Sequence, residues 1–243
     1  MGYDIDTNPV VGNGKIFINA FDRFICVDAD SGRELWQNTL VDAKQDPCTY
    51  GRKVYVSDYY ELVCCNADTG EKLWEKEFGF EFRPGPPTAG NGKVYVVFSE
   101  MPAGEGWLYC YAASTGDRLW RYRLGDYVCV GAPLFLEGRV YLHGHVARPT
   151  SVLCFDGEAG KLLWRTDIGE APTSQRRPCV RNGKVFLGDY DCVVSCLNAA
   201  GGALLWQHTM DKEKDRYLYE MCAGDNKLFV DTQGDSLYCF KVD

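Results

Sequence analysis

One sequence unit occurs six times along this chain, and this repeat constrains the possible folds more than any other feature. Each unit contains a basic residue followed by an aliphatic-aromatic-aliphatic triplet, as in Lys53 and residues 54–56. The six basic positions are Lys15, Lys53, Lys93, Arg139, Lys184 and Lys227. Successive positions are 38 to 46 residues apart, a period typical of repeat architectures that stack or close into a ring.

A second block follows in every unit, at a fixed spacing. A Cys closes a short apolar run, a Gly lies six residues later and a Trp ten residues later in the first five units. The Cys and Trp positions are Cys26, Trp36, Cys64, Trp74, Cys110, Trp120, Cys154, Trp164, Cys196, Trp206 and Cys239. The sixth unit reaches residue 243 before its Gly and Trp.

The local patterns predict strands. Apolar residues alternate with a period of two, and the Asn-Gly pairs at 13–14, 91–92 and 182–183 favour tight hairpin turns, in which both central residues need a positive φ. Four strands in each of six units predict an all-β, six-bladed β-propeller of four-stranded antiparallel blades. The blades are expected at about 7–40, 45–78, 85–124, 131–168, 176–210 and 219–243, in a single domain.

The last blade lacks its outer strand at the C-terminus. Residues 1–5 align with 164–168, so we expect them to complete this blade and close the ring. A strand supplied by a partner chain is the alternative. We expect a monomer.

Composition excludes some partners. The chain has 243 residues and a net charge of −8, which argues against nucleic acid, because phosphate binding needs clustered Lys and Arg. No apolar run approaches the ~18 residues that indicate a membrane span. No signal peptide is predicted from the polar first residues.

The 12 Cys suggest metal binding, redox chemistry or packing. Equivalent positions on separate sheets lie too far apart for a shared ion or a disulfide, so the main Cys column is interpreted as packing. A shorter column, Cys48, Cys179 and Cys222, receives the same interpretation, and Cys65, Cys129 and Cys192 fit neither column. Many free thiols favour a reducing cytoplasm, unless a leader has been removed for export.

No catalytic, cofactor or metal site is predicted. His143 and His145 lie on one face of a strand, but no third ligand accompanies them, and a structural role is favoured. The chain shows no Ser-His-Asp order, Walker loop or HExxH motif.

The segments between the second and third strands, and between blades, vary in length and composition. A rigid scaffold with one variable face is typical of binding proteins, and exposed aromatic and charged groups suit protein or glycan recognition. The alternative is that these loops only solvate the domain. The candidate binding face comprises Phe21, Asp22, Tyr59, Tyr60, Trp107, His143, His145, Tyr190, Asp191 and Asp235.

The block Cys-x-Asp-x-x-Ser/Thr-Gly-x-x-x-Trp, with variations, resembles the tryptophan-docking repeat of the PQQ-like (pyrroloquinoline quinone-like) propeller superfamily. It occurs at 26–36, 64–74, 110–120, 154–164 and 196–206. In that family the first position is usually Ala, and the Trp packs between neighbouring blades. The resemblance extends to quinoprotein dehydrogenases, BamB-type assembly lipoproteins and kinase sensor domains.

The resemblance implies a choice of function. Quinoprotein dehydrogenases have eight blades and insertions for quinone and calcium, and some carry an adjacent Cys pair; Cys64-Cys65 is more simply explained by the repeat. We therefore expect a non-catalytic protein- or peptide-binding scaffold or sensor module without cofactor. The alternatives are a quinoprotein-type oxidoreductase using PQQ and calcium, and a glycan-binding propeller.

Overall fold

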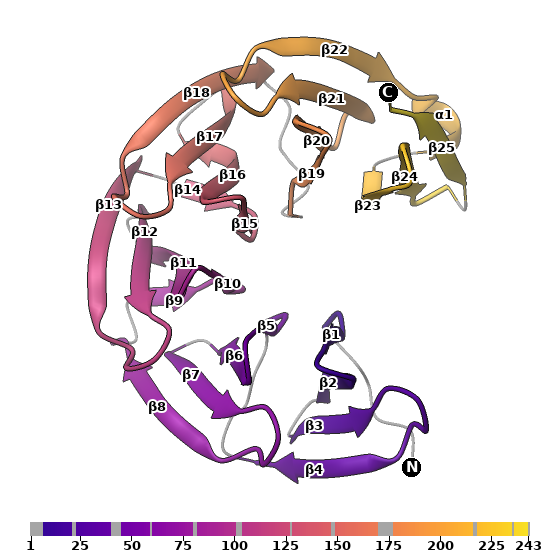
Figure 1. The fold of residues 1–243 in the computed structure, drawn as a ribbon. Helices are drawn as coiled ribbons and strands as arrows, with labels where there is room; N and C mark the ends of the chain where they lie inside the picture. Colours follow the sequence, from indigo (N-terminus) through magenta and orange to yellow (C-terminus); the bar gives the residue numbers. More distant parts are fainter. Residues whose placement is uncertain are drawn as a thin grey trace. The chain divides into compact units, whose positions relative to one another are not determined.

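The computed structural model describes residues 7–20, 23–39, 45–58, 60–79, 82–100, 104–126, 128–146, 149–169, 177–215, 218–234 and 236–242. Six antiparallel sheets follow one another along the chain, with one short helix among the described residues (Figure 1). This confirms the predicted all-β class and its six blades. The chain divides into two compact units, residues 1–123 and 124–243, and each is described by itself.

The first unit carries three blades. Blade 1 contains β1 (Val10–Gly12), β2 (Lys15–Ala20), β3 (Arg23–Asp28) and β4 (Glu34–Asn38). Blade 2 contains β5 (Cys48–Tyr50), β6 (Lys53–Ser57), β7 (Glu61–Asn66) and β8 (Lys72–Glu77). Blade 3 contains β10 (Thr88–Gly90), β11 (Lys93–Glu100), β12 (Glu105–Ala112) and β13 (Arg118–Asp126), and β9 (Phe82–Pro84) also pairs with β11. In each blade the strands pair in chain order.

The second unit carries the other three. Blade 4 contains β15 (Leu134–Leu136), β16 (Arg139–Val146), β17 (Thr150–Asp156) and β18 (Leu162–Gly169), and β14 (Val128–Val130) also pairs with β16. Blade 5 contains β19 (Cys179–Arg181), β20 (Lys184–Gly188), β21 (Val193–Asn198) and β22 (Leu204–Thr209). Blade 6 contains β23 (Leu218–Gly224), β24 (Lys227–Thr232) and β25 (Leu237–Lys241).

The first turns that contain Asn-Gly have the predicted geometry. Asn13 and Gly14 have φ values of 54° and 70°, and Asn182 and Gly183 have 49° and 69°. Two successive positive values define the primed turns that match the twist of a hairpin. Each turn therefore fixes the pairing register of the strands beside it.

The three repeated side-chain columns form one row across blades 1, 2, 4 and 5. In blade 2, Tyr55 pairs with Cys64, and Cys64 pairs with Trp74 on the other side. The rings of Tyr55 and Trp74 approach to 5.8 Å between centroids. The same row joins Phe17, Cys26 and Trp36; Tyr141, Cys154 and Trp164; and Phe186, Cys196 and Trp206. Cys is small enough to let the two aromatic rings meet above it.

A β-bulge precedes the Trp in four of the blades. In blade 2, Cys64 faces Trp74, but the next residue, Cys65, faces Lys72, so Leu73 is the extra residue. The same shift leaves out Leu35, Leu163 and Leu205. A bulge bends its strand and redirects the neighbouring side chains; here Leu73 is 44% exposed while Trp74 turns toward the core.

Each redirected indole contacts the following blade of its unit. The Nε1–H groups of Trp36, Trp74 and Trp164 donate to the backbone carbonyls of Ala67, Ala113 and Ala199, each at 3.2 Å. Apolar clusters fill the same interfaces, joining blade 1 to 2, 2 to 3, 4 to 5 and 5 to 6. The docking predicted from the family resemblance is thus present within both units.

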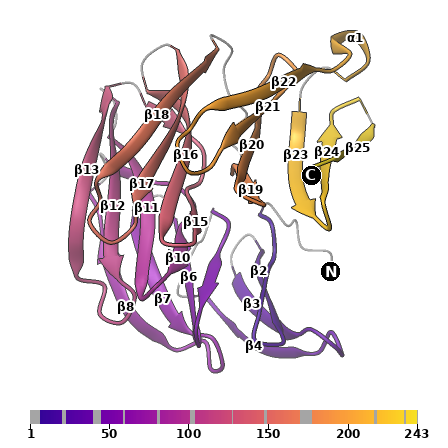
Figure 2. The same cartoon turned by 45° about the horizontal axis from the view of Figure 1, so that its top comes forward.

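Blade 6 shows three strands among the described residues. The helix α1 (Lys212–Asp215) follows β22 and precedes β23 along the chain (Figure 2). The buried carboxylate of Asp215 accepts hydrogen bonds from Thr232 Oγ1 at 3.1 Å and Tyr238 hydroxyl at 2.8 Å. Residues 1–5, the predicted closing strand, lie outside the described residues.

Candidate functional site

One carboxylate organises the loop between β6 and β7. Asp58 Oδ1 accepts hydrogen bonds from the backbone N–H groups of Tyr60 at 2.6 Å and Glu61 at 2.8 Å. Asp side chains commonly organise turns in this way. The turn leaves the Tyr60 side chain 44% exposed.

The end of β8 meets this loop. The Phe78 N–H donates to the Tyr60 carbonyl at 2.6 Å, and the Phe78 ring packs edge-on against Phe98, with 4.3 Å between centroids. Together the two segments line a pocket of about 560 Å³. Its lining residues are Asp58, Tyr60, Glu61, Glu77, Phe78 and Gly79; we call it the acidic pocket.

Two carboxylates of the acidic pocket oppose each other. Glu61 pairs directly with Glu77 in the register of β7 and β8, and like charges at opposed positions destabilise a sheet. Partial burial, followed by the charges of Asp58 and Glu75, raises the pKa of Glu61 above its usual value. Within the described ranges, no Lys or Arg forms an ion pair with Asp58, Glu61 or Glu77.

The corresponding loop of blade 5 differs in its charge balance. Asp189 Oδ1 accepts from the N–H groups of Asp191 and Val193, each at 2.9 Å, and burial raises the Asp189 pKa. Tyr190 is 44% exposed, as predicted for a loop residue. However, Asp191 pairs with Lys212 at 3.2 Å, so its charge is already neutralised.

Two predicted face residues lie elsewhere. His143 is 1% exposed, because β16 continues to Val146 and pairs His143 with Val152 inside the sheet. It lies in a strand, as predicted, but its inclusion in an exposed binding face was wrong. Trp107 is half-buried in β12, and the Arg121 guanidinium lies 4.5 Å from its ring centroid. It packs with the core of blades 2 and 3.

The structure therefore brings one predicted side chain, Tyr60, into a pocket. Tyr190 and Asp191 belong to the second unit, and the backbone of His145 pairs with Cys129. Phe21, Asp22, Tyr59 and Asp235 lie outside the described residues. The opposition of Glu61 and Glu77 was not predicted from the sequence. It follows from the Cys64–Trp74 pair when the pairing is continued along both strands, away from the Leu73 bulge.

The thiols occupy positions suited to packing. Cys26, Cys64, Cys110, Cys154 and Cys196 have no exposed surface. Burial raises the pKa of Cys64 to about 12 and of Cys154 to about 11, so neither is an activated nucleophile. Cys64 and Cys65 point into different clusters, toward blade 3 and blade 1 respectively.

Cys222 and Cys239 depart from this pattern, because both are exposed. Cys239 lies on β25, and no described strand covers the outer edge of β25. Over the described part of the chain, no group of three or more His, Cys, Asp or Glu side chains is arranged to hold a metal ion. No helix within those ranges is long and apolar enough to cross a bilayer.

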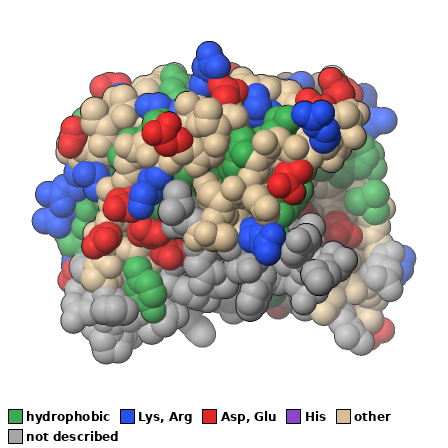
Figure 3. Space-filling view, turned by 90° about the horizontal axis from the view of Figure 1, so that it is seen from below, with side chains coloured by type: hydrophobic (Ala, Val, Ile, Leu, Met, Phe, Trp, Pro, Cys, Tyr) green, Lys and Arg blue, Asp and Glu red, His purple; other side chains and the backbone are tan. Residues whose placement is uncertain are grey.

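One face of the molecule mixes both signs of charge. On the face drawn in Figure 3, Lys and Arg side chains lie among Asp and Glu side chains. The acidic pocket gathers the carboxylates of Asp58, Glu61 and Glu77.

Comparison with known proteins agrees with the repeat geometry. The family model described as "Outer membrane protein assembly factor BamB" matches residues 2–64, 58–148 and 148–243. The chain belongs to the PQQ-like β-propeller family. Its sheets are the blades of that fold, and each docked Trp is the family's blade-to-blade contact. No curated protein matches the sequence.

Solved structures share this fold at low identity. BamB from Moraxella catarrhalis is 15% identical with a TM-score of 0.69, over 98% of this chain and 77% of that one. The quinohemoprotein alcohol dehydrogenase from Comamonas testosteroni is 13% identical with a TM-score of 0.73, over 94% of this chain and 51% of that one. A europium-containing methanol dehydrogenase is 12% identical with a TM-score of 0.70, over 89% and 53%. The chain spans about half the length of these dehydrogenases.

Proposed function

We propose that this PQQ-like propeller is a non-catalytic binding module that recognises a basic segment of a protein partner in the acidic pocket. The opposition of Glu61 and Glu77 across β7 and β8 carries the proposal. A cationic side chain placed between them would relieve their repulsion, so binding gains energy that the free protein lacks. The similarity to BamB, described as an assembly factor, supports a protein partner.

The aromatic residues of the pocket suit the same ligand. Tyr60 is exposed and Phe78 is half-buried beside it, and the face of an aromatic ring attracts Lys and Arg cations. A pocket of about 560 Å³ accommodates one or two side chains of a peptide. The chemistry therefore favours an Arg or Lys flanked by small residues.

A fluorescent acetyl-Ala-Arg-Ala-Arg-Ala-amide peptide tests this function by anisotropy at low salt. We expect saturable binding that falls at least tenfold in the Glu61→Gln/Glu77→Gln variant. The matched control is Glu71→Gln, an exposed carboxylate just before β8, at the other end of the β7–β8 hairpin. The same peptide with Gln in place of Arg should not bind.

Equal losses in the Glu71→Gln protein would show a general charge effect and reject the pocket. Undiminished binding by the double variant would reject it as well. Saturable binding to a glycan array, without binding to the Arg peptide, would favour the glycan alternative instead.

An oxidoreductase function receives less support from this chain. The described residues offer no cluster of carboxylates suited to a calcium ion, and the thiols of Cys64 and Cys65 are buried on opposite faces of β7. We therefore derive no step through quinone or calcium. Dye reduction after addition of both to the protein remains the direct measurement of that alternative.

A further inference from the structure

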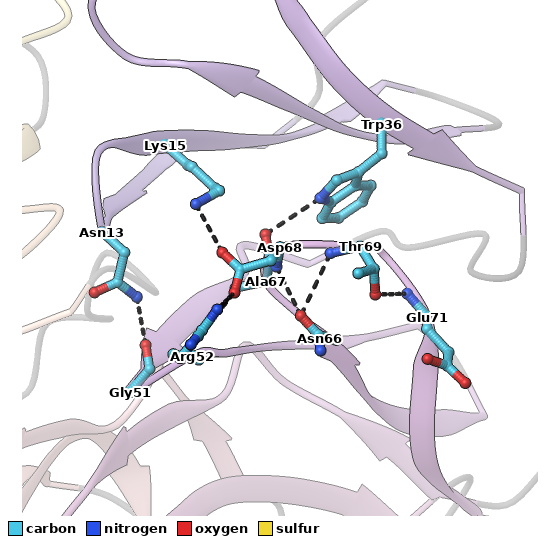
Figure 4. A network of polar contacts seen from close by, with 10 residues as sticks. All are labelled: Asn13, Lys15, Trp36, Gly51, Arg52, Asn66, Ala67, Asp68, Thr69 and Glu71. Atoms are coloured by element: carbon cyan, nitrogen blue, oxygen red, sulfur yellow. Dashed lines mark hydrogen bonds and ion pairs between the residues drawn. The ribbon is translucent and has the colours of Figure 1, made fainter.

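A second site is suggested by comparing two equivalent junctions between blades. At the junction of blades 1 and 2, Lys15 Nζ lies 2.8 Å from Asp68 Oδ1. Arg52 Nε donates to Asp68 Oδ2 at 2.8 Å from the other side (Figure 4). One carboxylate thus neutralises the basic residue that the repeat places at every first turn.

The next junction lacks that carboxylate. Lys53 holds the position of Lys15, and Ser114 holds the position of Asp68, each four residues after the repeat Cys. Lys53 Nζ instead donates to the backbone carbonyls of Ala113 at 3.2 Å and Ser114 at 3.4 Å. Neither acceptor carries a charge, and no described Asp or Glu forms an ion pair with Lys53.

The Ala113 carbonyl is shared among three donors. Besides Lys53, it accepts from the Tyr55 hydroxyl at 3.1 Å and from Trp74 Nε1 at 3.2 Å. A carbonyl oxygen has two lone pairs, and an ammonium group has three N–H donors. Lys53 is therefore held in place while keeping donor capacity for an incoming anion.

A pocket lies beside this ammonium group. It has a volume of about 390 Å³. Its walls include the side chains of Tyr50 and Leu73, which are 39% and 44% exposed. Lys53, Tyr55 and Ser114 also line it. Asn66 and a second cation, Arg52, also line the pocket, but Arg52 is paired with Asp68. Apolar walls with a few polar or charged groups are the usual features of a small-molecule site.

We propose that this pocket binds a carboxylate attached to a flat apolar group, with the carboxylate on Lys53 in the place that Asp68 occupies at the preceding junction. The apolar group would lie against Tyr50 and Leu73. Such a group occurs in small aromatic acids and in the C-terminal residue of a peptide. The site is independent of the acidic pocket, so either proposal can fail without the other.

Phenylacetate is the probe, and the indole N–H signal of Trp74 in protein labelled with ¹⁵N-tryptophan is the readout. Assignment uses Trp74→Phe. We expect a saturable shift with phenylacetate and none with phenylacetamide, which has the same ring without the charge. Lys53→Met should weaken binding at least tenfold, whereas Lys15→Met, the same change at the carboxylate-paired position, should leave it within twofold.

Ser114→Asp provides the second variant, should Lys53→Met fold poorly. It restores the repeat's own carboxylate, so it should raise the melting temperature and abolish phenylacetate binding. Acetyl-Gly-Phe with a free C-terminus, compared with its amide, distinguishes a peptide source from a small acid. Equal shifts with phenylacetamide, or full binding by the Ser114→Asp protein, would overturn the proposal.

Discussion

The indole of Trp36 lies directly on Gly70 of the following blade. A Cβ built on Gly70 would stand 2.6 Å from the Trp36 Cε3 atom, closer than carbon atoms approach without repulsion. Gly116 and Gly202 meet Trp74 and Trp164 in the same way. At these three positions the Gly of the repeat is therefore the surface on which the Trp of the preceding blade docks.

Gly70→Ala should destabilise the first unit for two reasons, a positive φ of 74° and the contact with Trp36. Gly32→Ala is the matched control, because Gly32 has a φ of 68° and no atom within 4 Å of the added Cβ. We expect Gly70→Ala to cost about 1–3 kcal/mol more than the control. Urea unfolding followed by Trp fluorescence measures the difference, and equal costs would mean that backbone conformation alone selects Gly.

The Leu163 bulge allows a test of what orients the Trp164 indole toward Ala199. Deleting Leu163 would return β18 to regular pairing and remove the shift that places Trp164 against Ala199, so we expect a loss approaching the ~3–5 kcal/mol of a Trp truncation. Leu163→Ser keeps the bulge at a position 43% exposed and should cost no more than about 1 kcal/mol. Thermal unfolding of the two variants distinguishes the roles; a deletion as mild as the substitution would contradict the bulge interpretation.

The Glu61 pKa predicts a pH dependence of stability. The folded protein holds the Glu61 proton more tightly than the unfolded chain, because burial and neighbouring carboxylates raise the pKa. Stability from this group therefore falls as pH rises above the usual Glu range. Glu61→Gln should match the wild type near pH 4 and exceed it at pH 7, by about 0.2–1 kcal/mol. A stability difference between the two proteins that stays constant from pH 4 to pH 7 would argue against titration of Glu61.

Thiol reactivity should separate the cysteines by burial. Cys222 and Cys239 are exposed, whereas burial raises the pKa of Cys26 and Cys196 to about 11. The thiolate is the reactive form, so brief iodoacetamide treatment at pH 8 should label Cys222 and Cys239 first. Peptide mass spectrometry reads the order, and early labelling of Cys64 or Cys154 would show that the interior opens readily.

The fold was readable from the sequence because its signals are local and repeated. Asn13-Gly14 specifies its turn by backbone preference alone, and the spacing of Cys64 and Trp74 reports two neighbouring strands. The row that joins Tyr55, Cys64 and Trp74 was not recognised, although each column was, because assigning partners across strands requires the register.

The candidate sites were harder to predict from the sequence, since they depend on positions where a blade departs from the repeat or from regular strand pairing. The bulge at Leu73 decides which residues face each other at the far end of β8, and hence that Glu61 meets Glu77. The exchange of Asp68 for Ser114 was visible in the repeat, but its meaning depends on the contact between Lys15 and Asp68. His143 was predicted to lie in a strand and was also included in the candidate binding face, because the sequence did not show that β16 packs this side chain inside the sheet.

The indole bonds of Trp36, Trp74 and Trp164 all end on backbone carbonyls. A main-chain acceptor is present whatever side chain evolution installs at that position. The sequences of neighbouring blades can therefore change independently, at nearly all positions besides the Trp, without losing the hydrogen bond between the indole and the carbonyl. This tolerance gives a physical reason why one architecture persists among proteins that share only 12% to 15% of their residues with this chain.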